Sequence, residues 1–261
     1  KAAGPSAANW LPVAIDGFES PAWMMSESIS STADGPWESA AGVTLNASIR
    51  SSKTRTSRAR CRGRGVSARR ADETTPIEET VSAFDRLIQD GKIRYYCLCN
   101  FPAWAATRAL WAADKRNMEM AVGLQLPYNL FRRDIEDEIF GLVRDQGLGV
   151  MAYSPLAVGL LTGLYAPDAP PPEESLWAKR RWRDRFNRAL SERNGAVLAA
   201  VHEIATELDA TPAQVSLAWV LSHPEITVAD VGCDTVYQID ENLGAFDLEL
   251  SPTQINRLNG E

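Results

Sequence analysis

The 261-residue sequence is poor in histidine and cysteine, with only two His and four Cys. Its cysteines, at positions 61, 97, 99 and 233, show no repeated paired spacing, so we expect neither a disulfide framework nor a zinc site. No apolar run approaches the roughly 18 residues that a membrane-spanning helix needs. The N-terminus also lacks a basic segment followed by an apolar stretch. These absences predict a cytoplasmic protein with reduced thiols, no bound metal and no membrane partner.

Two phosphate-binding signatures are also missing, GxGxxG and GxxxxGK[ST]. The net charge of -7 argues against a chain-wide nucleic-acid surface. Residues 50–70 are the exception, with nine basic and no acidic side chains. Such a block is typical of a solvated, self-repelling segment. No aromatic residue interleaves with these charges, so we do not expect nucleic acid as a partner.

What the sequence does contain is a regular pattern of helices and strands after about residue 71. Pro76, Glu78 and Glu79 suit the start of a helix, with Thr75 as its N-cap. This helix should run to about residue 90 and stop at Gly91, before a β-branched and aromatic strand over 93–99.

The same alternation of helix and strand continues to the C-terminal part of the chain. Further helices are predicted over about 102–116, 134–146, 194–208, 211–221 and 236–246, and further strands over 121–126, 148–154 and 225–232. Residues 159–192 interrupt the pattern as a long loop with a basic surface helix. Four buried strands, each followed by a helix, predict an α/β fold, either half of an eight-stranded barrel or most of a doubly wound sheet.

Polar side chains follow these predicted strands at their carboxyl ends, where either architecture binds its ligand. Asn100, Gln125 and Tyr153 would place two carboxamides beside an aromatic ring, a set suited to a planar amide such as nicotinamide. In the alternative interpretation, the two carboxamides only cap the next helix. Gly159 and Gly163 could likewise present backbone N–H groups to phosphates or simply form tight turns.

Six motifs occur in one order between about Asp72 and Asn259. They are TPIEET (75–80), GKIRY (91–95), Asn100-Phe101, QLPYNL (125–130), YSPLAVGLLTG (153–163) and GCDTVYQIDENLGAFDLELSP (232–252). Together they resemble the C-terminal half of an aldo-keto reductase. This resemblance implies a (β/α)8 barrel of the TIM type, with about the last four βα units recognisable. It also implies an oxidoreductase that uses NADP or NAD to reduce a small-molecule carbonyl substrate.

The resemblance further implies eleven cofactor-binding positions. Asn100 and Gln125 resemble the pair that binds the nicotinamide carboxamide, and Tyr153 resembles the aromatic residue that stacks on the nicotinamide ring. The positions that match the pyrophosphate loop are Ser154, Pro155, Leu156 and Ala157. Those that match the adenosine end are Gly232, Gln238, Glu241 and Asn242.

Three positions depart from the family pattern. Cys99 stands where Ser is common, Leu164 where a Lys usually meets the phosphates, and Asp234 where Ser, Lys or Arg meets the 2′-phosphate of NADP. An acidic residue there favours a ribose 2′-hydroxyl, so NAD becomes an alternative cofactor. The basic cluster Lys179, Arg180, Arg181 and Arg183 in the long loop could still supply a phosphate partner, and the alternative is that it forms the solvated face of a helix.

The catalytic residues of the family have no clear counterpart. No Tyr precedes Tyr95 and no His precedes His202, and Arg69 occupies the place of the family's His. A permanent guanidinium cation cannot shuttle a proton near neutral pH. Asp34 and Lys53 lie in surroundings that do not match the family, so we name no catalytic residue. The family's carbonyl turnover is thus in doubt, and the alternative is a catalytically inactive nucleotide-binding or interaction module.

These observations divide the chain at residue 70. Residues 1–70 are unrecognisable and fit a disordered or out-of-frame segment, whereas residues 71–261 resemble the C-terminal half of the barrel. Half a barrel would leave open sheet edges. We therefore expect self-association through these edges.

Overall fold

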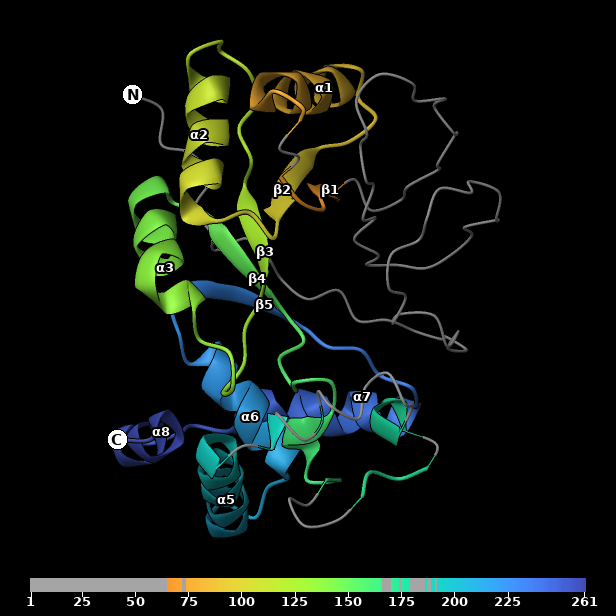
Figure 1. Cartoon of the computed structure of the whole chain (residues 1–261), viewed down its shortest axis with the longest axis vertical. Helices are drawn as coiled ribbons and strands as arrows, with labels where there is room; N and C mark the ends of the chain where they lie inside the picture. Colours follow the sequence, from red (N-terminus) through yellow and green to blue (C-terminus); the bar gives the residue numbers. More distant parts are fainter. Residues whose placement is uncertain are drawn as a thin grey trace. The chain divides into compact units, whose positions relative to one another are not determined.

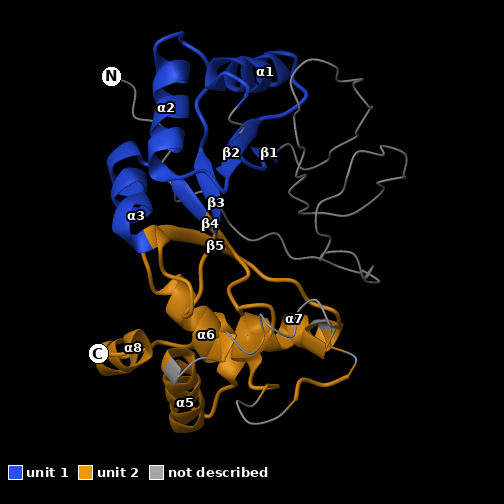
Figure 2. Ribbon diagram, in the orientation of Figure 1, with its two compact units in different colours: residues 1–126, 136–150 blue, residues 127–135, 151–261 orange. Residues whose placement is uncertain are grey.

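The computed structural model describes residues 65–71, 74–165, 170–173, 175–178, 186, 189–190 and 192–261. These residues fall into two units (Figure 2). Unit 1 comprises the described residues up to Leu126 together with Glu136–Val150, and unit 2 comprises Pro127–Ile135 and the described residues from Met151 onward. The predictions for residues 1–64, including Asp34 and Lys53, lie outside the described part of the chain. No helix in the described ranges is long and apolar enough to cross a bilayer.

Strands and helices alternate along the chain (Figure 1). In order, the strands are β1 (Gly65–Ala68), β2 (Tyr95–Cys99), β3 (Gly123–Pro127), β4 (Gly149–Tyr153) and β5 (Ile226–Asp230). The α-helices are α1 (Ile77–Gln89), α2 (Ala103–Asp114), α3 (Ile135–Gln146), α5 (Glu192–Glu207), α6 (Pro212–Leu221), α7 (Val236–Leu243) and α8 (Pro252–Asn259). Short 3-10 turns are η2 (Leu160–Thr162), η3 (Leu176–Ala178) and η4 (Gly244–Asp247).

The strands form a five-stranded sheet in the order β1-β2-β3-β4-β5. Val66 pairs with Tyr96 and Ser67 with Cys97 in the parallel β1–β2 ladder, and Cys99 pairs with Gln125 in the parallel β2–β3 ladder. Among the described strands the sheet is open, because β1 and β5 are its two edges. This is the predicted α/β fold, with the strand order of part of a (β/α)8 barrel.

β1 corrects the interpretation of residues 50–70 as a solvated basic segment. Residues 65–68 form a strand in which Val66, Ser67 and Ala68 are buried. In the sequence these three small side chains lie between Arg64 and Arg69. The basic composition of residues 50–70 therefore gives no sign of the strand that pairs with β2. The structured part of the chain therefore begins before residue 71, the predicted domain boundary.

Helix α1 forms largely as its sequence predicts. Its N-cap, however, is Pro76 rather than Thr75, and no side chain caps it. Val81 and Phe84 are buried, and Gly91 follows the helix with φ +66°, in the left-handed region that glycine tolerates best. Phe84 stacks on Tyr96 of β2 with 4.4 Å between ring centroids. This contact fixes α1 on one face of the sheet.

In unit 2, α6 is closed at its start by the predicted Thr211 cap. The Thr211 hydroxyl accepts a hydrogen bond from the Gln214 backbone N–H, and Gln214 Oε1 accepts from the Thr211 N–H. The predicted final helix over 236–246 is instead α7 followed by η4. Helix α8 is not among the predicted helices, although Ser251 and Gln254 form the same reciprocal cap there.

Candidate functional site

The three strands β1, β2 and β3 separate apolar from polar side chains. Neighbouring residues of a strand point to opposite faces, and directly paired residues share a face. One face carries Val66, Ala68, Tyr96, Leu98 and Leu124, all buried, and Tyr96 packs on α1. The opposite face carries Ser67, Cys97, Cys99, Gly123 and Gln125. A sheet face with hydroxyl, thiol and amide groups in place of bulky aliphatic side chains suits a binding site better than a packing layer.

Gln125 is the central polar group on this face. Its side chain is 4% exposed, and its Oε1 accepts a hydrogen bond from the Ser67 hydroxyl at 3.4 Å. Burial of an amide is costly unless the amide is hydrogen-bonded. Gln125 is thus a buried and oriented carboxamide.

Asn100 lies directly beyond β2, beside Gln125. Its backbone N–H donates to the Gln125 carbonyl oxygen at 3.0 Å. Its Nδ2 donates to the Arg69 carbonyl oxygen at 3.3 Å and to Cys99 Sγ at 3.2 Å. The residue has φ 56°, a left-handed conformation that Asn adopts more readily than most residues. The structure therefore brings Asn100 and Gln125 together, and several hydrogen bonds hold the Asn100 backbone and side chain.

The segment after β4 in unit 2 has an unusual backbone. Ser154, Ala157 and Val158 have φ values of 53°, 49° and 58°. Positive φ is unfavourable for these residue types, above all for a β-branched valine. Strain of this kind concentrates at ligand-binding loops, where the surrounding structure has to impose it.

Hydrogen bonds within unit 2 hold this strained segment in place. The Ala157 N–H donates to the Ser154 carbonyl oxygen at 3.0 Å, and the Tyr128 N–H donates to the Tyr153 carbonyl oxygen at 3.3 Å. The buried Asn129 donates from Nδ2 to the Ser154 carbonyl oxygen at 2.9 Å. Tyr153, Ser154, Leu156 and Ala157 are half-buried, whereas Pro155 is buried.

The four residues predicted for the adenosine end lie at the start and along the length of α7. Gln238 Oε1 accepts from the Asp234 backbone N–H at 2.6 Å, so its side chain closes the N-terminal end of the helix. Asn242 Nδ2 donates to Cys233 Sγ at 3.3 Å, and the Glu241 carbonyl oxygen accepts from Gln214. Gly232 is exposed and has open space around its Cα. The side chains of Gln238 and Asn242 therefore also have structural roles in this segment.

Two of the positions that depart from the family pattern are exposed in unit 2. Asp234 is exposed, and Leu164, at the position where the family usually has a Lys, is also exposed. The basic residues at 179–181 and 183 lie outside the described residues. A cation is therefore absent from position 164, where the family's Lys meets the phosphates, and from position 234, where the family's residue meets the 2′-phosphate.

Two cysteines beside these residues, Cys97 and Cys233, are neutral thiols near neutral pH. Burial raises the pKa of Cys97 to about 11, and burial also raises the pKa of Cys233. Cys97, Cys99 and Cys233 are not joined in disulfides. No cluster of three or more His, Cys, Asp or Glu that could hold a metal occurs in the described ranges.

Two residues that donate hydrogen bonds to the candidate site residues were not recognised from the sequence. Ser67 lies in the basic block, and only the pairing of β1 shows that it faces Gln125. Asn129 follows β3 within QLPYNL, where a buried Asn just after a strand is a signal for a turn or loop contact.

A family of known proteins matches most of this chain. The model of the aldo/keto reductase family matches residues 66–260. The chain belongs to this family. Within the aldo/keto reductase family, "Probable aldo-keto reductase 1" of Glycine max is 32% identical over 189 residues, which cover 72% of this chain and 52% of that protein. An uncharacterized oxidoreductase of Bacillus subtilis, YrpG, is 33% identical over 188 residues, 72% of this chain and 55% of that protein.

The similar proteins also include one that is named as a potassium channel subunit. "Probable voltage-gated potassium channel subunit beta" of Arabidopsis thaliana is 35% identical over 180 residues, 69% of this chain and 55% of that protein. The chain thus spans about half the length of these curated relatives.

Proposed function

We propose that this chain binds a nicotinamide adenine dinucleotide, NADP or NAD, as an oxidoreductase of the aldo/keto reductase family. The observation that carries the proposal is the adjacent pair Asn100 and Gln125, two oriented carboxamides, one directly after β2 and one within the neighbouring strand β3. Carboxamides donate and accept hydrogen bonds and so complement another amide. These residues fit the nicotinamide carboxamide.

The other predicted positions have matching chemistry for the rest of the dinucleotide. Tyr153 offers a ring for stacking, and the strained backbone after it suits a close approach of a pyrophosphate. At the adenosine end, Gln238, Glu241 and Asn242 offer polar groups on one helix. When bound, the dinucleotide would supply hydride chemistry toward a small-molecule carbonyl, while the residues of this chain bind and orient its ends.

The choice between the two dinucleotides rests on Asp234. A carboxylate repels a 2′-phosphate and accepts a hydrogen bond from a 2′-hydroxyl. We expect Asp234→Asn to raise the affinity for NADPH relative to NADH by roughly three- to tenfold, the range of one exposed charge interaction. Fluorescence titration measures both affinities, and Asp240→Asn, an exposed carboxylate of α7, serves as the control. An unchanged ratio in the Asp234 variant would remove Asp234 from the cofactor site.

A second candidate function is nucleotide binding without carbonyl reduction. It is favoured by Arg69, which stands in the place of the family's His and cannot exchange a proton near neutral pH. The relatives named as potassium channel β subunits make an interaction module a reasonable form of this candidate.

One experiment tests the proposal and separates the two candidates. The purified chain is titrated with NADPH and NADH by nucleotide fluorescence and then assayed with a panel of carbonyl compounds by absorbance loss. We expect binding that Gln125→Ala weakens about tenfold, the effect of one or two lost hydrogen bonds. Gln146→Ala, an exposed carboxamide in unit 1, should have no effect. Turnover would favour the reductase, binding alone the silent module, and no binding would overturn the proposal.

A further inference from the structure

Trp177 of η3 is a buried tryptophan that has no role in the proposed function. Its side chain is 5% exposed, and its indole Nε1–H donates to the Val158 carbonyl oxygen at 2.9 Å. A phenylalanine would fill much of the same space without a buried N–H group that needs an acceptor. The hydrogen bond from Trp177 therefore calls for an explanation beyond packing.

The acceptor of this hydrogen bond belongs to the strained segment after β4. Ala157, Val158 and Gly159 have consecutive positive φ values of 49°, 58° and 86°. Glycine tolerates this region, but a β-branched valine rarely adopts it. Contacts from the rest of unit 2 therefore have to offset the cost of the Val158 conformation.

The peptide group between Val158 and Gly159 is hydrogen-bonded on both sides. Its carbonyl oxygen accepts from Trp177, and its N–H, which belongs to Gly159, donates to the Leu156 carbonyl oxygen at 2.9 Å. Because a peptide group is planar, its C=O and N–H turn together when the backbone of Val158 rotates. Relaxation of Val158 to the extended region would turn both groups away from their partners. The two hydrogen bonds therefore favour the left-handed conformation.

Apolar packing holds the indole against this segment. Leu160, Trp177 and Phe186 form a buried cluster, and Ala157 and Val158 pack against it. The ring centroids of Trp177 and Phe186 lie 5.9 Å apart. A side chain that packing already immobilises loses little further conformational entropy when it donates a hydrogen bond. The indole is therefore a preorganised donor for the Val158 carbonyl oxygen.

We propose that Trp177 is a positioning residue that stabilises the left-handed conformation of Val158 and thereby the backbone of the pyrophosphate loop. This inference rests on the proposed function, in which Ser154 to Ala157 meet the pyrophosphate. Leu156 and Ala157 directly precede Val158, and the Leu156 carbonyl oxygen accepts from the same peptide group that Trp177 holds. Removal of the indole N–H would therefore loosen this loop and leave α7, at the adenosine end, unchanged.

The test uses Trp177→Phe, which keeps an aromatic ring and removes the N–H. The probes for the full chain are the reduced dinucleotide that it binds, ADP-ribose, which has the pyrophosphate without the nicotinamide, and AMP, which has neither. Nucleotide fluorescence measures the first, and competition with it measures the other two. We expect the variant to bind the dinucleotide and ADP-ribose about tenfold more weakly, the effect of one lost hydrogen bond to a buried acceptor. Its affinity for AMP should stay within about twofold of that of the wild type.

A second substitution separates positioning from packing. Val158→Gly relieves the left-handed strain, so it should restore most of the lost affinity when it is combined with Trp177→Phe. Val158→Ala keeps a Cβ and should restore less. Trp219→Phe is the matched control, because it removes an indole N–H that donates elsewhere in unit 2, to Asn259 Oδ1 at 3.1 Å. It should leave all three affinities unchanged.

A measurement on the wild type keeps the inference testable if Trp177→Phe folds poorly. Because the coupling between two linked events is reciprocal, a ligand that needs the ordered loop also stabilises the hydrogen bond from Trp177. ADP-ribose should therefore slow hydrogen exchange of the Trp177 indole N–H by at least about threefold, whereas AMP should not. Equal exchange rates with and without bound ADP-ribose would overturn the positioning role.

The outcomes distinguish this inference from the proposed function. If the wild-type chain binds no dinucleotide, both fail. If it binds and Trp177→Phe either leaves the affinity unchanged or weakens it without rescue by Val158→Gly, the proposed function stands and the role of Trp177 is overturned. An equal loss for AMP would overturn it as well, because the variant would then act on the whole site. Selective loss with rescue supports the positioning role.

Discussion

Asn100 and Ser154 each follow a strand directly, and each has a positive φ without being glycine. In both cases hydrogen bonds oppose the strain. Asn100 is held through its N–H and Nδ2, and the Ser154 carbonyl oxygen receives the Asn129 amide. Such residues cost stability in exchange for a fixed geometry, a balance common at binding sites.

This balance predicts different effects for two substitutions at Asn100. Asn100→Ala removes the side-chain hydrogen bonds and leaves a Cβ in the left-handed region, which costs about 1 to 2 kcal/mol. Asn100→Gly also removes the side chain but relieves the backbone strain. We expect both variants to lose nucleotide affinity and the alanine variant to be the less stable of the two in urea unfolding. Equal affinity of the glycine variant and the wild type would show that the Asn100 amide does not contact the ligand.

The partly buried thiol of Cys97 makes the free energy of unfolding depend on pH in the alkaline range. Folding raises its pKa from the ordinary value of 9.0 to about 11, so the protonated thiol is favoured in the folded state. This contribution is fully present below pH 9 and is lost as the pH rises toward about 11. We expect Cys97→Ala to flatten the fall of the unfolding free energy between pH 8 and pH 11.

Urea unfolding at several pH values measures this slope. Tyr96 provides an internal reference, because burial also raises its pKa and its contribution should persist in the variant. Identical slopes for the variant and the wild type would contradict the prediction.

The sequence indicates candidate site residues only where their position follows from the end of a predicted strand. Asn100, Gln125 and Tyr153 come at the ends of apolar runs, so their proximity to a ligand could be expected from the rule for parallel sheets. The contact between Ser67 and Gln125, by contrast, depends on pairing across three strands. No local pattern within residues 50–70 contains that information.

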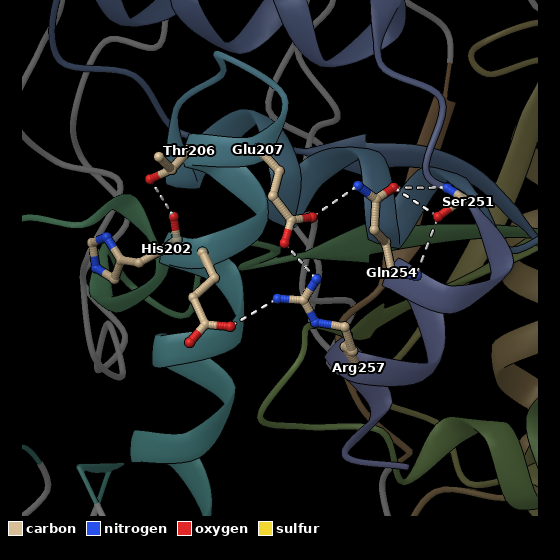
Figure 3. A network of polar contacts seen from close by, with 7 residues as sticks. His202, Thr206, Glu207, Ser251, Gln254 and Arg257 are labelled. Carbon is tan, nitrogen blue, oxygen red and sulfur yellow. Dashed lines mark hydrogen bonds and ion pairs between the residues drawn. The ribbon is translucent and has the colours of Figure 1, made fainter.

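Among the elements, α8 illustrates how a surface network and a buried contact differ. Arg257 donates to Glu207 at 2.6 Å and to Glu203 at 2.7 Å, both on α5, and Gln254 donates to Glu207 (Figure 3). The hydrogen bonds from Arg257 hold the pKa of Glu207 below its ordinary value. These groups are exposed to solvent and salt, whereas Leu258 of the same helix is 1% exposed.

We therefore expect Leu258, rather than the ion pairs, to hold α8 in place. Leu258→Ala should lower the unfolding free energy by about 2 to 4 kcal/mol, because it leaves a cavity in a packed core. Arg257→Ala should leave the value close to that of the wild type at about 0.15 M salt, where exposed ion pairs are screened. Thermal unfolding of the two variants compares them directly. A larger loss for Arg257→Ala would show that the network dominates.

At the same scale, the elements that the sequence predicted are those with their own start and stop signals. The helices α1 and α6 have proline at or before the first turn, and α1 ends at a glycine. Ser251-Pro252 with Gln254 is an equivalent signal for α8 and was available in the sequence. By contrast, β1 is four residues long and lies among arginines, so it is defined by its pairing with β2 rather than by composition.

At the scale of the whole molecule, α7 carries apolar side chains that the described residues leave exposed. Val236, Ile239, Leu243 and Phe246 recur every three or four residues and so share one side of α7 and η4. Their exposed fractions range from 47% to 68%, and no residue of α7 is buried. A continuous apolar stripe of this kind is typical of an interaction surface.

We expect this stripe to be a second surface for self-association, in addition to the open sheet edges predicted from the sequence. The variant with Ile239→Glu and Leu243→Glu should shift the protein toward monomer by at least about tenfold in dissociation constant, since charges disfavour an apolar interface. Sedimentation velocity over a range of concentrations measures the shift. Trp104→Glu, at an equally exposed aromatic residue of α2, is the matched control. A wild-type chain that stays monomeric at high concentration would contradict the expectation.

In the proposed nucleotide site, the side chain of Gln238 would link ligand occupancy to local order at the start of α7. Its Oε1 accepts the Asp234 N–H, and a rotamer that turned it toward an adenosine would break this hydrogen bond. In that rotamer the start of the helix would lose an acceptor to the nucleotide. Bound nucleotide would then raise the rate of deuterium exchange at the Asp234 amide, unless an oxygen of the ligand replaced Gln238 Oε1 as its acceptor.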